Sequence, residues 1–157
     1  MSDRLKYARV APEAARAMRA LQDYVNATGL EHSLLELVKL RASYMNGCAY
    51  CADMHTQDAR AAGETEQRLY MVPLWREAPF YTDRERAALA WTEAVTRLGE
   101  YGVSDSVYHE ALCHFTEKEL VELTLAVVAI NGWNRLSVAF QTEVGSYRGV
   151  VATASAV

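Results

Sequence analysis

The sequence predicts an all-α protein, a single-domain helical bundle of about six or seven helices. Three observations favour this class: helix start and stop signals recur along nearly the whole chain, strand-like alternation is absent over any useful length, and there are only 3 prolines and 8 glycines. A chain of this length can bury roughly two thirds of its unfolded surface. We therefore expect residues 1–157 to form one domain of helices with short connections.

The first three expected helices fill the N-terminal half of the chain. One opens with Pro12 in a first-turn position and stops at Gly29, a favourable residue at a helix end. In the next, Ser33 is followed three residues later by Glu36, the spacing of a capping box. A third helix continues from the Asn46-Gly47 pair. These helices are expected over residues 11–29, 33–47 and 48–63.

The C-terminal half repeats the same start signals. Thr82 with Glu85 and Thr116 with Glu119 each have capping-box spacing, and Ser104 opens a shorter helix between them. The expected helices span residues 82–99, 104–115 and 116–140.

Composition excludes several classes of partner. The formal net charge of -4 leaves no basic surface for nucleic acid. The first ten residues lack the apolar segment of a signal peptide, and the most apolar run, Leu123 to Ile130, is far shorter than the ~20 residues that span a bilayer. Three cysteines cannot all pair within one chain. We expect a cytoplasmic protein without membrane or nucleic-acid partners, in which a CxxC pair is catalytic or metal-binding.

The stretch NGCAYCADMH carries the chemistry. Cys48, Cys51 and His55 share one helix face with small alanines, which lets another helix approach closely. Near a helix start the free N–H groups favour a thiolate. Cysteines three residues apart can form a disulfide after modest movement, and His55, one turn beyond Cys51, can accept a thiol proton.

Each of these residues also has a simpler interpretation than redox chemistry. A CxxC pair can be half of a zinc site, but the only further ligands are Cys113 with His109 or His114, which lack a metal-site spacing. Glu36 can be nothing more than the capping partner of Ser33. We expect Cys113 to be a small buried hydrophobic residue.

The segment from Glu36 to His55 resembles the Glu-x11-Cys-x2-Cys-x3-His signature of alkylhydroperoxidase D and its relatives in the carboxymuconolactone decarboxylase-like superfamily. Residues 54–70, 75–95 and 122–140 resemble the same core domain and its C-terminal helix. The resemblance covers the chain from about residue 34 to residue 140, which would be the core of the domain. It implies a helical, oligomeric fold with peroxidase activity of the peroxiredoxin type.

Within that resemblance, four residues have expected roles. Glu36 and His55 form a proton relay, Cys51 attacks the peroxide, and Cys48 resolves it to a disulfide. The sequence alone leaves the reverse cysteine order open, because Cys48 is nearer the helix start, where the dipole is strongest. Alkylhydroperoxidase D proper has a histidine immediately before its second cysteine, where this chain has Tyr50, so we interpret the chain as a member of the broader core-domain family.

The expected reaction needs an external dithiol. No Gly-x-Gly-x-x-Gly or P-loop pattern occurs, so no bound nucleotide or other cofactor is expected, and no metal. In the family the reductant is a lipoyl-type dithiol or a partner protein. Two alternatives remain: a lactone decarboxylase, which works without the cysteine pair, and a non-enzymatic thiol sensor or assembly protein.

The last long helix indicates self-association. Residues 120–130, LVELTLAVVAI, and the following NGWNRLSVAF are too continuously apolar for a helix with one wet face. The other helices have charged outer faces and can cover it only in part. Together with the family resemblance, this predicts a homo-oligomer, a trimer or hexamer.

Overall fold

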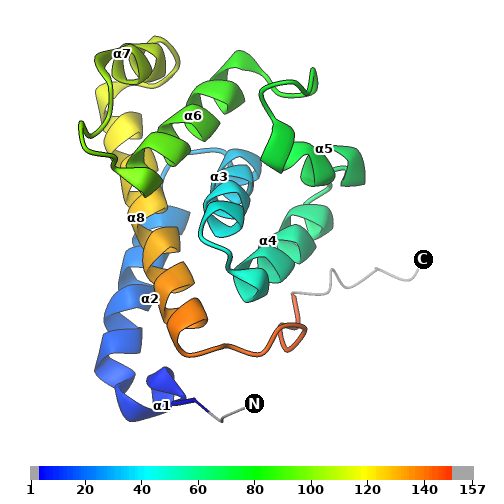
Figure 1. The fold of residues 1–157 in the computed structure, drawn as a ribbon, viewed down its shortest axis with the longest axis vertical. Helices are drawn as coiled ribbons and strands as arrows, with labels where there is room; N and C mark the ends of the chain where they lie inside the picture. Colours follow the sequence, from blue (N-terminus) through cyan, green and yellow to red (C-terminus); the bar gives the residue numbers. More distant parts are fainter. Residues whose placement is uncertain (1–3, 150–157) are drawn as a thin grey trace.

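The computed structural model describes residues 4–149, and within that range it contains helices and no strands (Figure 1). The prediction of an all-α single domain is confirmed. The elements are α1 (Tyr7–Val10), α2 (Pro12–Asn26), α3 (His32–Met45), α4 (Ala49–Ala61), α5 (Glu66–Met71), the 3₁₀ turn η1 (Val72–Leu74), α6 (Asp83–Arg97), α7 (Asp105–His114) and α8 (Glu117–Ala139). The eight α-helices exceed the predicted six or seven because α1 and α5, with four and six residues, are too short to show apolar periodicity.

Helix α3 lies at the centre of the fold. It packs against α4, α6 and α8, while α2 runs beside α8 and α7 packs on α6 (Figure 1). Nine of its fourteen residues are buried, among them the charged Glu36 and Lys39. A helix that is covered on several sides has no wet face for ionic side chains. The charges of Glu36 and Lys39 must therefore find their partners inside the protein.

Two of the three expected capping boxes are present. In α6 the Thr82 hydroxyl accepts from the backbone N–H of Glu85, and the Glu85 carboxylate accepts from the N–H of Thr82. Thr116 and Glu119 make the same exchange at the start of α8. Each box pairs two backbone donors that a helix start would otherwise leave without partners.

The capping box predicted for the second helix is wrong. Helix α3 begins at His32, one residue before Ser33, and its N-cap Glu31 makes no side-chain capping hydrogen bond. Glu36 therefore lies in the second turn of α3 and is directed into the protein. The preceding helix also ends earlier than expected, at Asn26 rather than at Gly29.

Apolar packing divides into two large clusters on either side of α3. One holds α3 against α2, α6, α7 and α8, and includes Val38, Leu123 and Val127. The other joins α3 to the segment from α5 to α6, through Leu37, Leu40 and other side chains. Together they hold α3 from both sides, so the residues on α3 occupy fixed positions.

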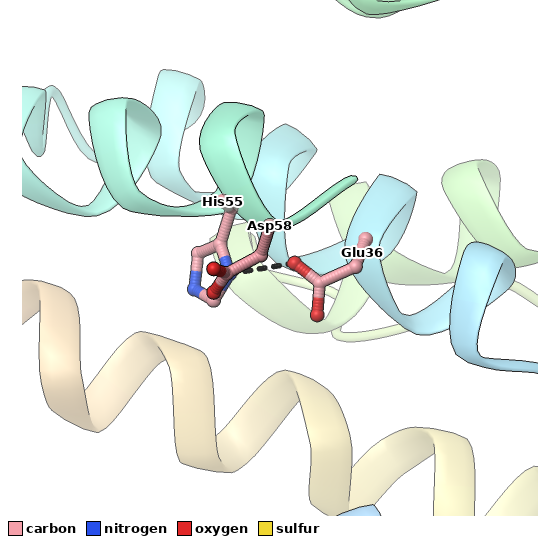
Figure 2. Close-up of side chains that lie close together, drawn as sticks. All are labelled: Glu36, His55 and Asp58. Atoms are coloured by element: carbon pink, nitrogen blue, oxygen red, sulfur yellow. Dashed lines mark hydrogen bonds and ion pairs between the residues drawn. The ribbon is translucent and has the colours of Figure 1, made fainter. Parts of the chain in front are cut away.

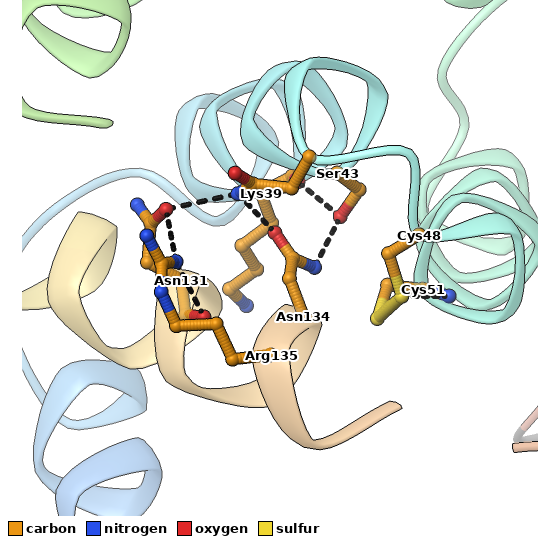
Figure 3. The surroundings of a disulfide bond; sticks show 8 residues. Lys39, Ser43, Cys48, Cys51, Asn131, Asn134 and Arg135 are labelled. Atoms are coloured by element: carbon orange, nitrogen blue, oxygen red, sulfur yellow. Dashed lines mark hydrogen bonds between the residues drawn. A yellow bond between two sulfur atoms is a disulfide. The ribbon is translucent and has the colours of Figure 1, made fainter. Parts of the chain in front are cut away.

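A polar network, fully buried at Ser43 and Asn134, ties the end of α3 to α8 (Figure 3). Asn46 donates to the side-chain oxygens of Asn131 and Asn134, each at 2.9 Å. Asn134 in turn donates to Ser43 Oγ at 3.1 Å. The chain then turns through Gly47, whose φ of +66° is in the left-handed region that favours glycine. This network fixes the turn that leads into α4.

No helix within residues 4–149 is both long enough and apolar enough to cross a membrane.

Replacing Asn134 by alanine should lower the free energy of unfolding by roughly 2–3 kcal/mol, because Ser43 and Asn46 each lose a buried partner. Urea denaturation measures the effect. The matched control is Gln67→Ala, an exposed amide on α5, with an expected change below about 0.5 kcal/mol. Equal effects in the two variants would show that the network contributes nothing to stability.

Candidate functional site

The cysteine pair sits at the start of α4. Cys48 and Cys51 are bonded as a disulfide, with their Cα atoms 5.3 Å apart, and both residues are buried. Cys48 is the N-cap residue, and its sulfur accepts the N–H of Cys51 at 3.3 Å. Ala42 of α3 and Ile130 of α8 pack around the pair. The sulfurs therefore lie at the positive end of the α4 dipole, in an apolar seam.

The third cysteine does not belong to this site. Cys113 is a free thiol on α7 and is exposed, so the expectation that it is buried is wrong. The apolar face of α7 is carried instead by Ala111, which is fully buried.

A buried hydrogen-bonded chain lies beside the disulfide. His55 Nδ1 is 2.8 Å from Glu36 Oε2 (Figure 2). On the other side of the carboxylate, Lys39 Nζ is 2.8 Å from Glu36 Oε1. The exposed fractions are only 6% for His55, 3% for Glu36 and 5% for Lys39. The two helices that carry them, α3 and α4, pack directly against each other. Glu36 thus bridges an imidazole and an ammonium group within the protein interior.

The charge state of Glu36 follows from these contacts. Burial raises the pKa of the Glu36 carboxyl group, but the hydrogen bond and charge of His55 and the charge of Lys39 outweigh it and lower the pKa from 4.5 to about 2. Glu36 is therefore an acceptor only, so the proton between it and His55 belongs to Nδ1. When the imidazole is neutral, Nε2 is therefore the ring nitrogen that can accept a proton.

A cavity of about 500 Å³ lies next to these hydrogen-bonded side chains. Cys51 and His55 lie in its wall, whereas Cys48 does not line it. The wall combines apolar and aromatic side chains with a similar number of polar and ionisable ones. It is lined by Tyr7, Gln22, Asn26, Leu30, His32, Leu35, Glu36, Lys39, Tyr50, Cys51, Met54, His55, Asp58, Trp133 and Ser137. Of the two cysteines, Cys51 is the one that a molecule in the cavity would meet.

Two further residues at the site were not predicted from the sequence. Asp58 lines the cavity, and one of its oxygens lies within 4.8 Å of both a His55 ring nitrogen and a Glu36 oxygen (Figure 2). Tyr147, beyond the end of α8, donates its hydroxyl to Asp58 Oδ1 at 2.8 Å. Asp58 follows His55 by three residues, a helical spacing that could have identified it. Tyr147 is 89 residues distant and gave no such signal.

The possible metal ligands do not include the cysteines. Within residues 4–149 the one cluster of three ligand side chains is Glu36, His55 and Asp58. There the hydrogen bond between His55 and Glu36 already occupies Nδ1 and Oε2, and Lys39 holds the other Glu36 oxygen. A cation would have to compete with an ammonium group. Cys113 and its neighbouring histidines form no such cluster in the described part of the chain.

Helices α3 and α4, with Cys51 of a CxxC pair and a buried Glu–His pair facing one cavity, define an alkylhydroperoxidase D-like core domain. The chain belongs to the carboxymuconolactone decarboxylase family, which its residues 12–94 match. It is 42% identical over 146 residues to the uncharacterised protein YdfG of Bacillus subtilis, covering 93% of this chain and 99% of the relative.

Solved structures with the same fold agree. One is a protein of unknown function from Agrobacterium tumefaciens, described as a candidate AhpD antioxidant defence protein. It has 44% identity and a TM-score of 0.89, covering 93% of this chain and 100% of that one. Another is an uncharacterised peroxidase-related protein with an AhpD core from Ralstonia eutropha. It has 20% identity and a TM-score of 0.78, covering 88% and 74%, and shows the likeness of fold alone.

The ionised Glu36 should make stability depend on acid pH. Because folding lowers the pKa of Glu36 to about 2, its contribution is present above pH 4.5 and declines as the pH falls toward 2. The difference in unfolding free energy between the wild type and Glu36→Gln should shrink between pH 6 and pH 3 by an amount on the order of 2 kcal/mol.

Urea titrations across that pH range measure the difference. The control is Glu77→Gln, which removes an exposed carboxylate. A difference for Glu36→Gln that stays constant with pH would contradict a stabilising buried carboxylate at this position.

Proposed function

We propose that the protein is a thiol-dependent peroxidase that reduces hydroperoxides through the Cys48/Cys51 pair. The observation that carries this proposal is that Cys51 and His55 face one cavity, with Glu36 orienting the imidazole from behind. A base next to a thiol is what activates a cysteine nucleophile near neutral pH. Family membership and the AhpD-like structural relatives support the same class of chemistry.

In the reduced protein, Cys51 is the attacking residue. His55 Nε2 takes the Cys51 proton, directly or through a water molecule, and the resulting imidazolium stays hydrogen-bonded to Glu36 through Nδ1. The thiolate attacks the distal peroxide oxygen, and the O–O bond breaks. The electron pair leaves with the alkoxide, which takes the proton from His55 to become an alcohol. Cys51 becomes a sulfenic acid.

Cys48 then resolves the intermediate. Its thiolate attacks the Cys51 sulfur, the S–O bond breaks, and the departing hydroxide takes up the Cys48 proton as water. The product is the Cys48–Cys51 disulfide, the arrangement in the structure. The place of Cys48 at the N-cap, outside the cavity wall, suits a residue that meets the sulfenic acid rather than the peroxide.

Turnover needs an external reductant. Attack on the disulfide by a dithiol, either lipoyl-type or on a redox protein, transfers two electrons and restores both thiols. No bound cofactor is part of this cycle, and a reducing cytoplasm would supply the dithiol. Tyr50 lies between the two cysteines in the sequence, and its side chain lines the cavity. It would therefore contact the reductant as well as the substrate.

The decarboxylase after which the family is named is the alternative activity, and a non-enzymatic thiol sensor is another. A redox pair beside a histidine in the cavity wall favours the peroxidase over the decarboxylase. Catalytic turnover with excess dithiol distinguishes the peroxidase from the sensor, which would be oxidised once.

Three cysteine variants test the assignment. With cumene hydroperoxide and excess dihydrolipoamide, Cys51→Ser should lose turnover at least about a hundredfold, because the attacking sulfur is gone. In the absence of added dithiol, pre-reduced Cys48→Ser should still consume about one equivalent of peroxide and stop at the sulfenic acid, which dimedone traps. Cys113→Ser is the matched control and should keep full turnover. If Cys48→Ser fails to consume that equivalent while Cys51→Ser retains it, the roles are reversed.

We also propose that the chain assembles as a homo-oligomer, a trimer or a hexamer. Helix α8 is covered by α2, α3 and α6 on its inner side, yet Val121, Val128 and Val138 remain exposed on it. Light scattering on a gel-filtration peak should give three or six times the 17.5 kDa chain mass. Val128→Glu should shift the distribution toward smaller species if this face is the interface. A wild-type monomer with full activity would refute the proposal.

A further inference from the structure

The chain after α8 returns to the candidate site. Its backbone N–H at Gly145 donates to Asp53 Oδ2 at 3.2 Å, and the Tyr147 hydroxyl donates to Asp58 Oδ1 at 2.8 Å. Both acceptors are on α4, so this C-terminal tail, residues 143–149, runs from the end of α8 to lie beside α4 (Figure 1). Of the two aspartates it holds, only Asp58 lines the cavity.

Tyr147 donates a hydrogen bond to Asp58 and keeps its proton. Burial, the hydrogen bond to Asp58 and the nearby negative charges raise the pKa of Tyr147 to about 12. The phenol therefore keeps its proton across the physiological range and can only donate to the carboxylate. The hydrogen bond from Tyr147 holds one oxygen of Asp58, and the Asp58 carboxylate lies beside the His55 ring (Figure 2).

Apart from Asp58, the fixed charges around His55 cancel. From α3, Glu36 and Lys39 face the imidazole as an ion pair with no net charge, and the exposed His32 lies 3.8 Å from Glu36. From α4 come Asp58 and Cys51, and the tail adds the neutral Tyr147. The remaining titratable groups of the cavity wall are the phenols Tyr7 and Tyr50, and α2 and α8 contribute only uncharged side chains. Asp58 is thus the unbalanced negative charge.

We propose that Asp58, held by Tyr147, is a positioning residue that stabilises the His55 imidazolium formed when Cys51 gives up its proton. The inference rests on the proposed peroxidase function, since it concerns the same proton transfer. The proton moves from Cys51 Sγ to His55 Nε2, and the electron pair of the S–H bond stays on sulfur. A carboxylate within 4.8 Å of the ring favours the charged product of that transfer over the neutral pair.

The test measures thiol reactivity rather than peroxidase activity. In a Cys48→Ser/Cys113→Ser background, Cys51 is the single thiol, and iodoacetamide reports its thiolate fraction at each pH. We expect Asp58→Asn to lower the ratio of the rate constants at pH 7 and pH 9.5 by about threefold to tenfold. At pH 9.5 the thiol ionises without help from His55, so the rate there should change little.

Matched variants separate this effect from a loss of structure. Asp53→Asn removes another α4 carboxylate that holds the tail, and should leave the ratio unchanged. Asp58→Glu should recover most of the wild-type ratio, and Tyr147→Phe should lower it less than Asp58→Asn does. Circular dichroism checks that each variant is folded.

An unchanged ratio in Asp58→Asn, or an equal fall in Asp53→Asn, would overturn the inference. Because alkylation consumes no peroxide, absence of hydroperoxide turnover in the wild type would refute the proposed function and leave this result standing. The two failures are therefore distinguishable.

Discussion

The buried contact of Glu36 with His55 and Lys39 is the interaction on which the rest of the site depends. Three ionisable side chains lie in the interior with exposed fractions of 6% or less, and such groups are tolerated only when each has a partner. The pairing crosses from α3 to α4, so it also fixes how those helices meet. Helix α3 supplies the carboxylate and the ammonium, helix α4 supplies the imidazole and the sulfurs, and the contact keeps them in one arrangement.

Much of the fold and of the site could be predicted from the sequence because the signals are local. The capping boxes at Thr82 and Thr116 are exchanges within four residues, and the Cys48-Cys51-His55 register is set by one helix. Ser33 and Glu36 had the same spacing as a capping box, yet the buried pairing with His55 and Lys39 takes Glu36 instead. A tertiary contact of that strength outweighs a local capping preference.

What the sequence could not predict depends on contacts between distant segments. Tyr147 meets Asp58 across 89 residues, and nothing in either neighbourhood indicates the partner. Cys113, predicted to be buried, is exposed for the same kind of reason. A lone cysteine between an apolar and a polar neighbour has no decisive pattern, and its exposure follows from how α7 lies on α6. The short α1 and α5 were missed because one or two turns are too few to establish a period.

Different helices supply the proposed reactive groups and the other side chains of the cavity wall. The groups proposed to do chemistry come from α3 and α4, which are held in the interior, whereas Tyr7, Gln22, Asn26 and Trp133 come from α1, α2 and α8. Substitutions at these four positions change the shape and polarity of the wall without removing the hydrogen bonds of Glu36. Relatives with this framework can therefore diverge in the molecules they admit while their reactive centre stays the same. Selectivity and reactivity are separately adjustable in such an architecture.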